Sequence, residues 1–335
     1  MAIQSLECPH CGAPIPPSVA KDVVVCAYCC RTLVGVPGAS WGMLAKSALL
    51  DEPAGNVDPR RVCVVLGRTY LLEGRLAAGE SSDVFLASRA GRVTERVIIK
   101  VLRALADEDL HAREWRIVHR LHASAAQGAA FFTTLLPQPV VKGIVDTGDG
   151  IRRSAIVYRW RSGFQHTLEE VRRAHAGGVT PRAAVWMWRR LLDLLGWVHR
   201  SGFVHGAVLP HHLLIHPRDH GVVLCGWSCA TELALAESAP ARNPRYAEYY
   251  RGGAESPAMD IAMSARSVAH VLGGDPAGDA LPGAVPAELA RLVRAFADGS
   301  TTEEDAWALR KRVGEVASRV LGPPRYERFD MPGWR

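Results

Sequence analysis

The chain has 335 residues, of which 48% are hydrophobic and 22% charged, a composition typical of soluble globular proteins and not of disordered ones. Its formal net charge of +6 is the balance of 40 Lys and Arg residues against 34 Asp and Glu residues. The basic residues are scattered instead of gathered in a dense run, so the charge is weak evidence for a nucleic-acid partner. No stretch reaches the roughly 18 apolar residues of a membrane span, and the N-terminus lacks a signal pattern. We therefore expect a cytoplasmic chain with reduced thiols and no membrane partner.

Two C-x-x-C pairs lie near the N-terminus. A spacing of two residues lets both sulfurs reach one ion at a tight turn, and two such pairs supply the four thiolates of a closed tetrahedral Zn²⁺ site. The ligands would be Cys8, Cys11, Cys26 and Cys29. Cys30 is a less favoured substitute for Cys29. Residues 22–36 are β-branched and alternating, as in a short hairpin. The pattern predicts a zinc ribbon over residues 1–35, with one structural Zn²⁺ that supplies its folding energy.

Residues 36–64 are punctuated by Pro and Gly around one short helical candidate at 41–50, and we interpret them as a linker. Strand character follows on both sides of a small-residue turn, and then in a third apolar run. These strands are expected within 69–88 and at 96–102, a helix is expected over 107–122, and further strands are expected near 138–146 and 153–160.

Beyond residue 160 the pattern becomes helical, most clearly over 183–202, where apolar residues recur at helical spacing. A strand-rich part followed by a helix-rich part predicts an α+β domain of two lobes. We place this domain at residues 65–321, with a C-terminal tail at 322–335.

Several short motifs follow one another along this domain. Lys100 ends the strand segment VIIK, Glu114 lies in the helix after it, FVHGAVLPHHLLI begins at Phe203, and Asp260 opens a later helical stretch. In this order the chain resembles the eukaryotic-like protein kinase superfamily. The resemblance implies a kinase-like fold with a β-rich N-lobe and a helical C-lobe. It also implies a retained Lys100–Glu114 pair, a core position for His205, and an Asp260 that steadies the loop.

The same resemblance shows where the chain departs from kinases. Ala207 stands in place of the proton-handling Asp, and His212 and Gly226 stand in place of the Mg²⁺-binding Asn and Asp. Glu80 lies in the expected phosphate loop, and Ile98 replaces a small residue above the adenine. We therefore expect a pseudokinase that is not an enzyme, that does not bind ATP with Mg²⁺, and that acts as a signalling scaffold for protein partners.

Two other functions stay open. The first is a divergent nucleotide-binding protein, or a weakly active Ser/Thr kinase, that uses Lys100 and Glu114. The second is a nucleic-acid binder that uses the ribbon, where basic and aromatic residues are few. Five His residues within 205–220 also raise the idea of a second metal site. Since His211 and His212 are adjacent, we expect their side chains to point apart and the cluster to serve the core and the loops.

Overall fold

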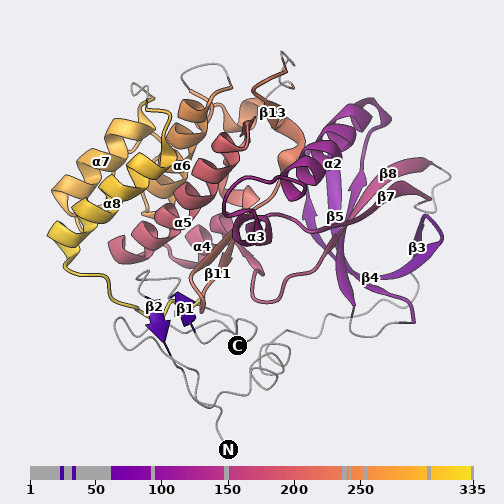
Figure 1. Ribbon diagram of the computed structural model, residues 1–335, viewed down its shortest axis with the longest axis horizontal. Coiled ribbons are helices and arrows are strands. Elements are labelled where there is room, and N and C mark those ends of the chain that lie inside the picture. The colour runs from indigo at the N-terminus through magenta and orange to yellow at the C-terminus, as the bar shows by residue number, and fades with distance from the viewer. Residues whose placement is uncertain are drawn as a thin grey trace, which may run out of the picture.

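In the computed structural model, the described residues are 23–25, 32–34, 62–91, 95–146, 151–235, 240, 243–251, 255–299 and 303–332. They form a lobe built on a β-sheet and a larger helical lobe, joined side by side (Figure 1). This is the two-lobed α+β architecture that the sequence predicts. The four cysteines of the predicted zinc site and the predicted helix at 41–50 lie outside the described residues. The hairpin expected over residues 22–36 is present, since β1 (Val23–Val25) pairs antiparallel with β2 (Thr32–Val34).

The N-lobe is a six-stranded sheet in the order β3-β4-β5-β6-β8-β7, with antiparallel neighbours throughout. Its strands are β3 (Val62–Val65), β4 (Arg68–Ala78), β5 (Ser82–Arg89), β6 (Arg96–Leu102), β7 (Pro139–Asp146) and β8 (Arg152–Arg159). Successive side chains of a strand point to opposite faces. Burial of Val97, Ile99 and Val101 in the core of the sheet therefore turns Ile98 and Lys100 to the other face.

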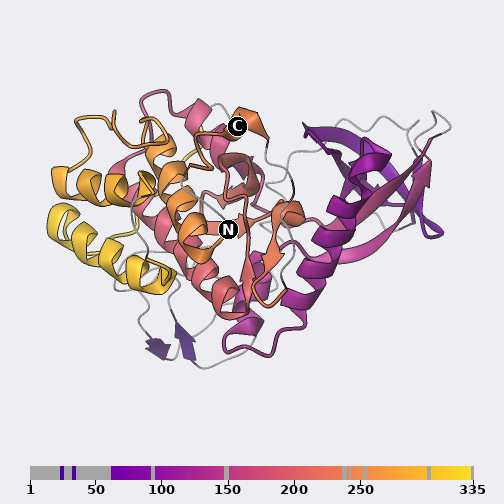
Figure 2. The ribbon, with the colours of Figure 1, turned by 90° about the horizontal axis from the view of Figure 1, so that it is seen from above.

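Helix α2 (Glu108–His122) runs alongside the sheet, on the side that faces the helical lobe (Figure 2). Ile117, Val118 and Leu121 are fully buried, and their spacing explains why this stretch forms an amphipathic helix. Glu114 lies one turn earlier on the same stripe, so the helix delivers a carboxylate to the sheet. Short helical turns flank α2: η1 (Leu105–Asp107), α3 (Ala129–Phe132) and η2 (Thr133–Leu135).

The C-lobe packs its helices around α5. They are α4 (Leu168–Ala174), α5 (Pro181–Arg200), α6 (Pro257–Val271), α7 (Ala287–Ala297) and α8 (Ala306–Leu321). Thr180 and Ser256 cap the starts of α5 and α6, each followed by a proline at the first helical position. None of the described helices is both long and apolar enough to cross a membrane.

Short strands and turns at the junction of the lobes hold the loops of the site. The strands are β9 (His166–Thr167), β10 (Phe203–Val204), β11 (Leu213–His216), β12 (Gly221–Leu224) and β13 (Thr231–Glu232). The turns are η3 (Pro210–His212), η4 (Trp227–Cys229) and η5 (Pro244–Tyr246). Antiparallel pairing of β11 with β12 brings residue 212 and residue 226 to the same end of a hairpin.

Candidate functional site between the lobes

A lysine–glutamate pair joins the sheet to α2. Lys100 Nζ lies 2.6 Å from Glu114 Oε2, and the Tyr158 hydroxyl donates a 2.8 Å hydrogen bond to Glu114 Oε1. Burial raises the pKa of Glu114, but the charge of Lys100 and the hydrogen bonds from Lys100 and Tyr158 outweigh it, so the pKa lies below its ordinary value. The glutamate is therefore ionised and holds the ammonium group in place. Its second partner, Tyr158, comes from β8, and nothing in the sequence indicates that contact.

A buried histidine fastens the first half of α2 to the sheet. His111 Nε2 lies 2.9 Å from the hydroxyl of Ser82 on β5, and Nδ1 lies 3.3 Å from the hydroxyl of Ser154 on β8. Burial, and then the charge of Lys100, lower the pKa of His111 to about 4. The neutral imidazole therefore bridges two hydroxyls, and this bridge sets the distance between α2 and the strands.

The turn between β4 and β5 occupies the place of a phosphate loop. It is closed by a 2.8 Å hydrogen bond from the Gly79 amide to the Ser82 carbonyl, and Arg103 Nη1 donates to the Gly79 carbonyl at 2.7 Å. Glu80 projects from the turn, and its Oε2 accepts a 2.5 Å hydrogen bond from Asn243 Nδ2. The turn is therefore tied to the segment that precedes η5 in the other lobe.

Asp260 organises the loop that begins at residue 205. Its carboxylate accepts hydrogen bonds from the main-chain amides of His205 and Gly206, at 2.8 and 2.9 Å, and His199 Nε2 lies 2.9 Å away. His205 Nε2 donates to the Cys225 carbonyl at 3.1 Å. Burial lowers the pKa of His205 to about 4. The structure thus places both residues, fully buried, beneath the start of the loop.

Ala207, His212 and Gly226 lie together at the end of this loop. Ala207 is fully buried, and its carbonyl accepts a 2.8 Å hydrogen bond from His212 Nδ1. The His212 ring lies flat against Gly226, where a Cβ atom would come within 2.6 Å of it. Gly226 also has a φ of +79°, a conformation that side-chain-bearing residues rarely adopt. The imidazole therefore fills the space that a side chain at residue 226 would occupy.

These three positions decide what the loop can bind. Mg²⁺ requires oxygen ligands in a near-octahedral arrangement, and Ala207, His212 and Gly226 offer no carboxylate or amide side chain. Burial, and then the neighbouring histidines, lower the pKa of His212 well below its ordinary value, so its imidazole is neutral. The donor set at these positions does not fit the Mg²⁺ ions of kinases, and it leaves one neutral imidazole at the end of the loop.

The histidines within residues 205–220 do not assemble a second metal site. The rings of His211 and His212 lie 4.3 Å apart, so the expectation that adjacent residues point apart is wrong, because η3 turns the chain there. His216 meets Phe164 edge to face, and His220 stacks on Trp186 at 4.3 Å. Within the part of the chain that the structure describes, no three His, Cys, Asp or Glu residues gather to hold a metal ion. Packing accounts for these rings.

Sequence reasoning missed two charged residues that stabilise the site. Arg266 is fully buried in α6 and donates from Nε to the Ala297 carbonyl and from Nη1 to the Tyr249 carbonyl, both at 2.7 Å. Arg120 of α2 forms an ion pair with Glu232 of β13. The hydrogen bonds of Arg266 fix the segment after η5, and the ion pair between Arg120 and Glu232 joins the two lobes. Both depend on contacts between residues distant in sequence, which no local pattern indicates.

The sequence of this region is similar to that of a known kinase family. Residues 73–225 match the profile of the Lipopolysaccharide kinase (Kdo/WaaP) family. The match includes Lys100, Glu114, Ala207 and His212, and it ends one residue before Gly226. A search of the curated proteins finds none that matches the chain.

Solved structures of kinases have the same fold. The BubR1 kinase domain aligns with a TM-score of 0.59 and 10% identity, covering 83% of this chain and 91% of that one. Vaccinia related kinase 3 aligns with a TM-score of 0.55 and 17% identity, covering 87% and 99%. A rhoptry antigen kinase domain of Toxoplasma gondii aligns with a TM-score of 0.51 and 15% identity, covering 83% and 93%. At these identities the likeness concerns the fold.

The family match overturns one expectation. From Ala207, His212 and Gly226 we expected a pseudokinase without enzymatic activity, but the matched family is one of kinases, which are enzymes. The expectation was wrong because it equated kinase chemistry with one set of side chains, whereas the similarity extends across the loop that carries Ala207 and His212. The chain therefore has a protein-kinase-like fold and, over residues 73–225, the sequence pattern of a lipopolysaccharide kinase family.

Proposed function

We propose that the protein is a kinase-fold phosphotransferase that binds a nucleotide between its lobes and transfers a phosphoryl group to a hydroxyl. The observation that carries this proposal is the Lys100–Glu114 pair, which lies inside the range matched by a kinase family. An ammonium group held at 2.6 Å by an ionised glutamate is a preorganised partner for a polyphosphate. The expectation that ATP does not bind rested on the same reasoning as the rejected absence of activity, and we replace it with this proposal.

Lys100 would bind the phosphates, and its position is set before the ligand arrives. Its side chain is 15% exposed, so the ammonium group is mostly withdrawn from water but still partly accessible. Electrostatic attraction to a phosphate is stronger in such a site than in bulk water. The mixed ionic and hydrogen-bonded contacts of Glu114 keep the carboxylate from turning away when a nucleotide enters.

His212 would accept the proton of the hydroxyl. Because Nδ1 donates to the Ala207 carbonyl, the lone pair of the neutral ring lies on Nε2. Proton transfer to a positioned base typically contributes about 10²–10⁴-fold to a rate, but a base of low pKa is a weak acceptor. We therefore infer slow turnover, consistent with a weakly active enzyme. Mg²⁺ has no part in the proposed transfer, because the side chains at positions 207, 212 and 226 do not fit it.

The acceptor class follows from the family match. The matched family is described as lipopolysaccharide kinases, and we propose a sugar hydroxyl of lipopolysaccharide as the acceptor. A protein serine or threonine is the alternative acceptor, and both present a primary or secondary hydroxyl to the same base. An assay that offers both acceptors separates the two.

The test is transfer of radiolabelled phosphate from ATP to lipopolysaccharide or to a mixed protein substrate. We expect slow labelling of lipopolysaccharide by the wild type, at least a tenfold loss in Lys100→Ala, and a comparable loss in His212→Gln. Lys142→Ala is the matched control, because Lys142 also pairs with a glutamate of α2, Glu108, at 2.9 Å. Melting curves of each variant show whether the fold is intact.

Two results would contradict the proposal. The first is the absence of labelled product from any acceptor with folded wild-type protein. The second is equal labelling by the wild type and Lys100→Ala, which would separate the reaction from the Lys100–Glu114 pair. Labelling of the protein substrate alone would keep the phosphotransferase and reject lipopolysaccharide as the acceptor.

A further inference from the structure

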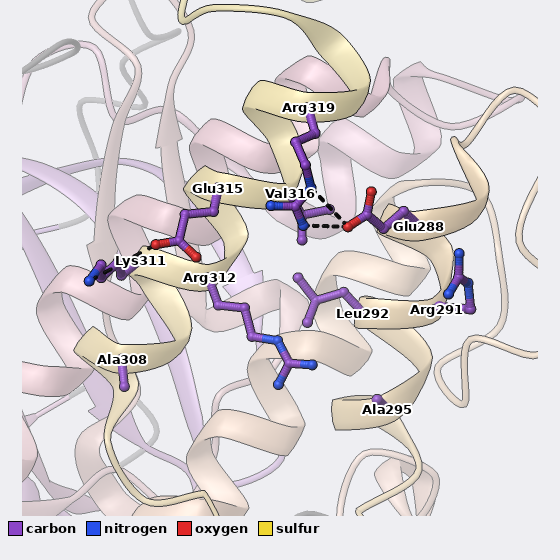
Figure 3. Close-up of a pocket in the computed structure, with 10 residues that line it drawn as sticks. All are labelled: Glu288, Arg291, Leu292, Ala295, Ala308, Lys311, Arg312, Glu315, Val316 and Arg319. Atoms are coloured by element: carbon purple, nitrogen blue, oxygen red, sulfur yellow. Dashed lines mark hydrogen bonds and ion pairs between the residues drawn. The ribbon is translucent and has the colours of Figure 1, made fainter.

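A groove runs between α7 and α8, on the far side of the C-lobe from the sheet (Figures 1 and 3). It encloses a volume of about 720 Å³ and is lined by one face of each helix. In Figure 3, Leu292 of α7 and Val316 of α8 point toward each other at its floor. Ala295 and Ala308 continue the apolar floor and are exposed. Small side chains here leave room for the side chains of another molecule.

The rim of the groove is basic. Four cations line it against two carboxylates, and both carboxylates are engaged: Glu288 forms an ion pair with Arg319, and Glu315 lies 4.0 Å from Lys311. Arg291 and Arg312 are exposed. Neither forms a hydrogen bond or an ion pair within the described part of the chain.

The guanidinium groups of Arg291 and Arg312 flank the floor. Figure 3 shows Arg312 extending from α8 into the space between the helices, while Arg291 projects from α7 on the other side of Leu292. Guanidinium groups bind carboxylates with two parallel hydrogen bonds, which gives direction as well as attraction. A ligand with carboxylates on both sides of a small apolar face would satisfy both arginines and cover the alanines.

We propose that the α7–α8 groove is a docking site for an acidic segment of a protein partner, one in which Glu or Asp residues alternate with small or apolar residues. The apolar floor argues against a nucleic acid, because a phosphate backbone carries no apolar side chain that could cover Ala295 and Ala308, and the position of the groove between two helices argues against a flat membrane surface. An acidic peptide can place its side chains on Arg291 and Arg312 and leave Glu288 and Glu315 to their present partners. This role does not depend on phosphoryl transfer, since the groove lies apart from the Lys100–Glu114 pair.

The probe is a short fluorescein-labelled peptide of Glu, Ala and Leu, and fluorescence anisotropy measures its binding to the full chain. The matched probe carries Gln at every Glu. We expect saturable, salt-sensitive binding of the acidic peptide and at least tenfold weaker binding by the double variant Arg291→Gln/Arg312→Gln. The control variant is Arg68→Gln/Arg152→Gln, which removes the same charge from exposed positions of the N-lobe.

The controls make each outcome decisive. Normal binding by the control variant, with loss in the groove variant, supports the site. No saturable binding of the acidic peptide, equal binding of the Gln peptide, or equal loss in both variants overturns it. Tighter binding of a labelled RNA oligonucleotide at the same groove would assign it to nucleic acid. A wild-type dimer that the groove variant abolishes, measured by light scattering, would assign it to a second copy. Either result rejects an acidic partner.

Discussion

His212 and Gly226 depend on each other. A side chain at residue 226 would enter the volume of the imidazole, and that ring is held in place by its hydrogen bond to the Ala207 carbonyl. The two residues that most clearly depart from the kinase pattern are therefore one structural unit. Restoring a carboxylate at residue 226 alone would displace the ring instead of creating a metal site.

The first prediction concerns Gly226→Ala. The backbone conformation costs about 1 kcal/mol for any side chain, and overpacking against the ring adds about 1–3 kcal/mol. Gly67 has a similar φ of +72° but no atom within 4 Å of its would-be Cβ, so Gly67→Ala measures the backbone cost alone. Chemical unfolding should show a clearly larger loss for Gly226→Ala, and the added change His212→Ala should recover the difference. Equal losses for the two glycine variants would show that the ring contact is unimportant.

The second prediction concerns acid stability. Burial lowers the pKa of both His111 and His205 to about 4. Between about pH 6.5 and pH 4 the unfolded chain binds protons that the folded chain does not, so the free energy of unfolding falls as pH falls through this window. Each histidine should account for about 2 kcal/mol between neutral pH and about pH 5. Urea unfolding of the wild type and of His205→Gln at both pH values measures this. A loss as large in the variant as in the wild type would contradict it.

Lys100 and Glu114 could be predicted, whereas their surroundings could not. A lysine at the end of an apolar strand and a glutamate on the buried stripe of the next helix are local patterns, and the order of motifs relates them. The contacts of Tyr158 with Glu114 and of His111 with Ser82 depend on the register of the strands and on the distance between α2 and the sheet. Those quantities depend on packing between elements, which one sequence does not specify.

At the level of the elements, a hydrogen bond ties the β4–β5 turn to the opposite lobe. Asn243 donates to Glu80, so the loss of either group should free the turn. The third prediction is that Asn243→Ala speeds hydrogen exchange at residues 79–81 and 243–251. Glu80→Gln is the matched control, because an amide oxygen at residue 80 can still accept the bond. Unchanged exchange in Asn243→Ala, measured by mass spectrometry, would show that the contact does not restrain the turn.

The fourth prediction concerns the N-terminal cysteine pairs. The second cysteine pair lies in the sequence between β1 and β2, which pair with each other, and we propose one structural Zn²⁺ held by Cys8, Cys11, Cys26 and Cys29. Elemental analysis should find one Zn²⁺ per chain, lost in Cys8→Ser and kept in Cys30→Ser, with an unchanged melting transition of the two-lobed domain. Metal-free protein after purification without chelators, or loss in both variants alike, would reject the proposed ligand set.

Most elements of the two lobes could be predicted because apolar residues recur at a different spacing in strands than in helices. The strands around residues 96–102 and 138–160 and the helix over 107–122 are found within a few residues of their expected bounds. The short strands β9, β10 and β13 could not be predicted, since segments of two residues carry no period. They form only because the larger elements bring distant segments together.

At the scale of the whole molecule, α2 connects the two lobes. It contacts the sheet through Glu114 and His111 and contacts β13 of the C-lobe through Arg120. A ligand that binds Lys100 therefore acts on α2, a helix that contacts both lobes. The ordered motifs predicted this fold, but they did not predict activity, because the chemistry of a site depends on which atoms face the ligand and not on matching a single loop.

Isothermal titration calorimetry tests whether Lys100 takes part in binding ATP. The titrations use wild type, Lys100→Ala and the matched control Lys142→Ala, each with and without Mg²⁺, beside melting curves that confirm folding. We predict saturable binding by wild type and by Lys142→Ala, at least tenfold weaker binding by Lys100→Ala, and little dependence on Mg²⁺, because positions 212 and 226 carry no oxygen ligand. The absence of binding by the wild type, or equal binding by all three proteins, would contradict the account.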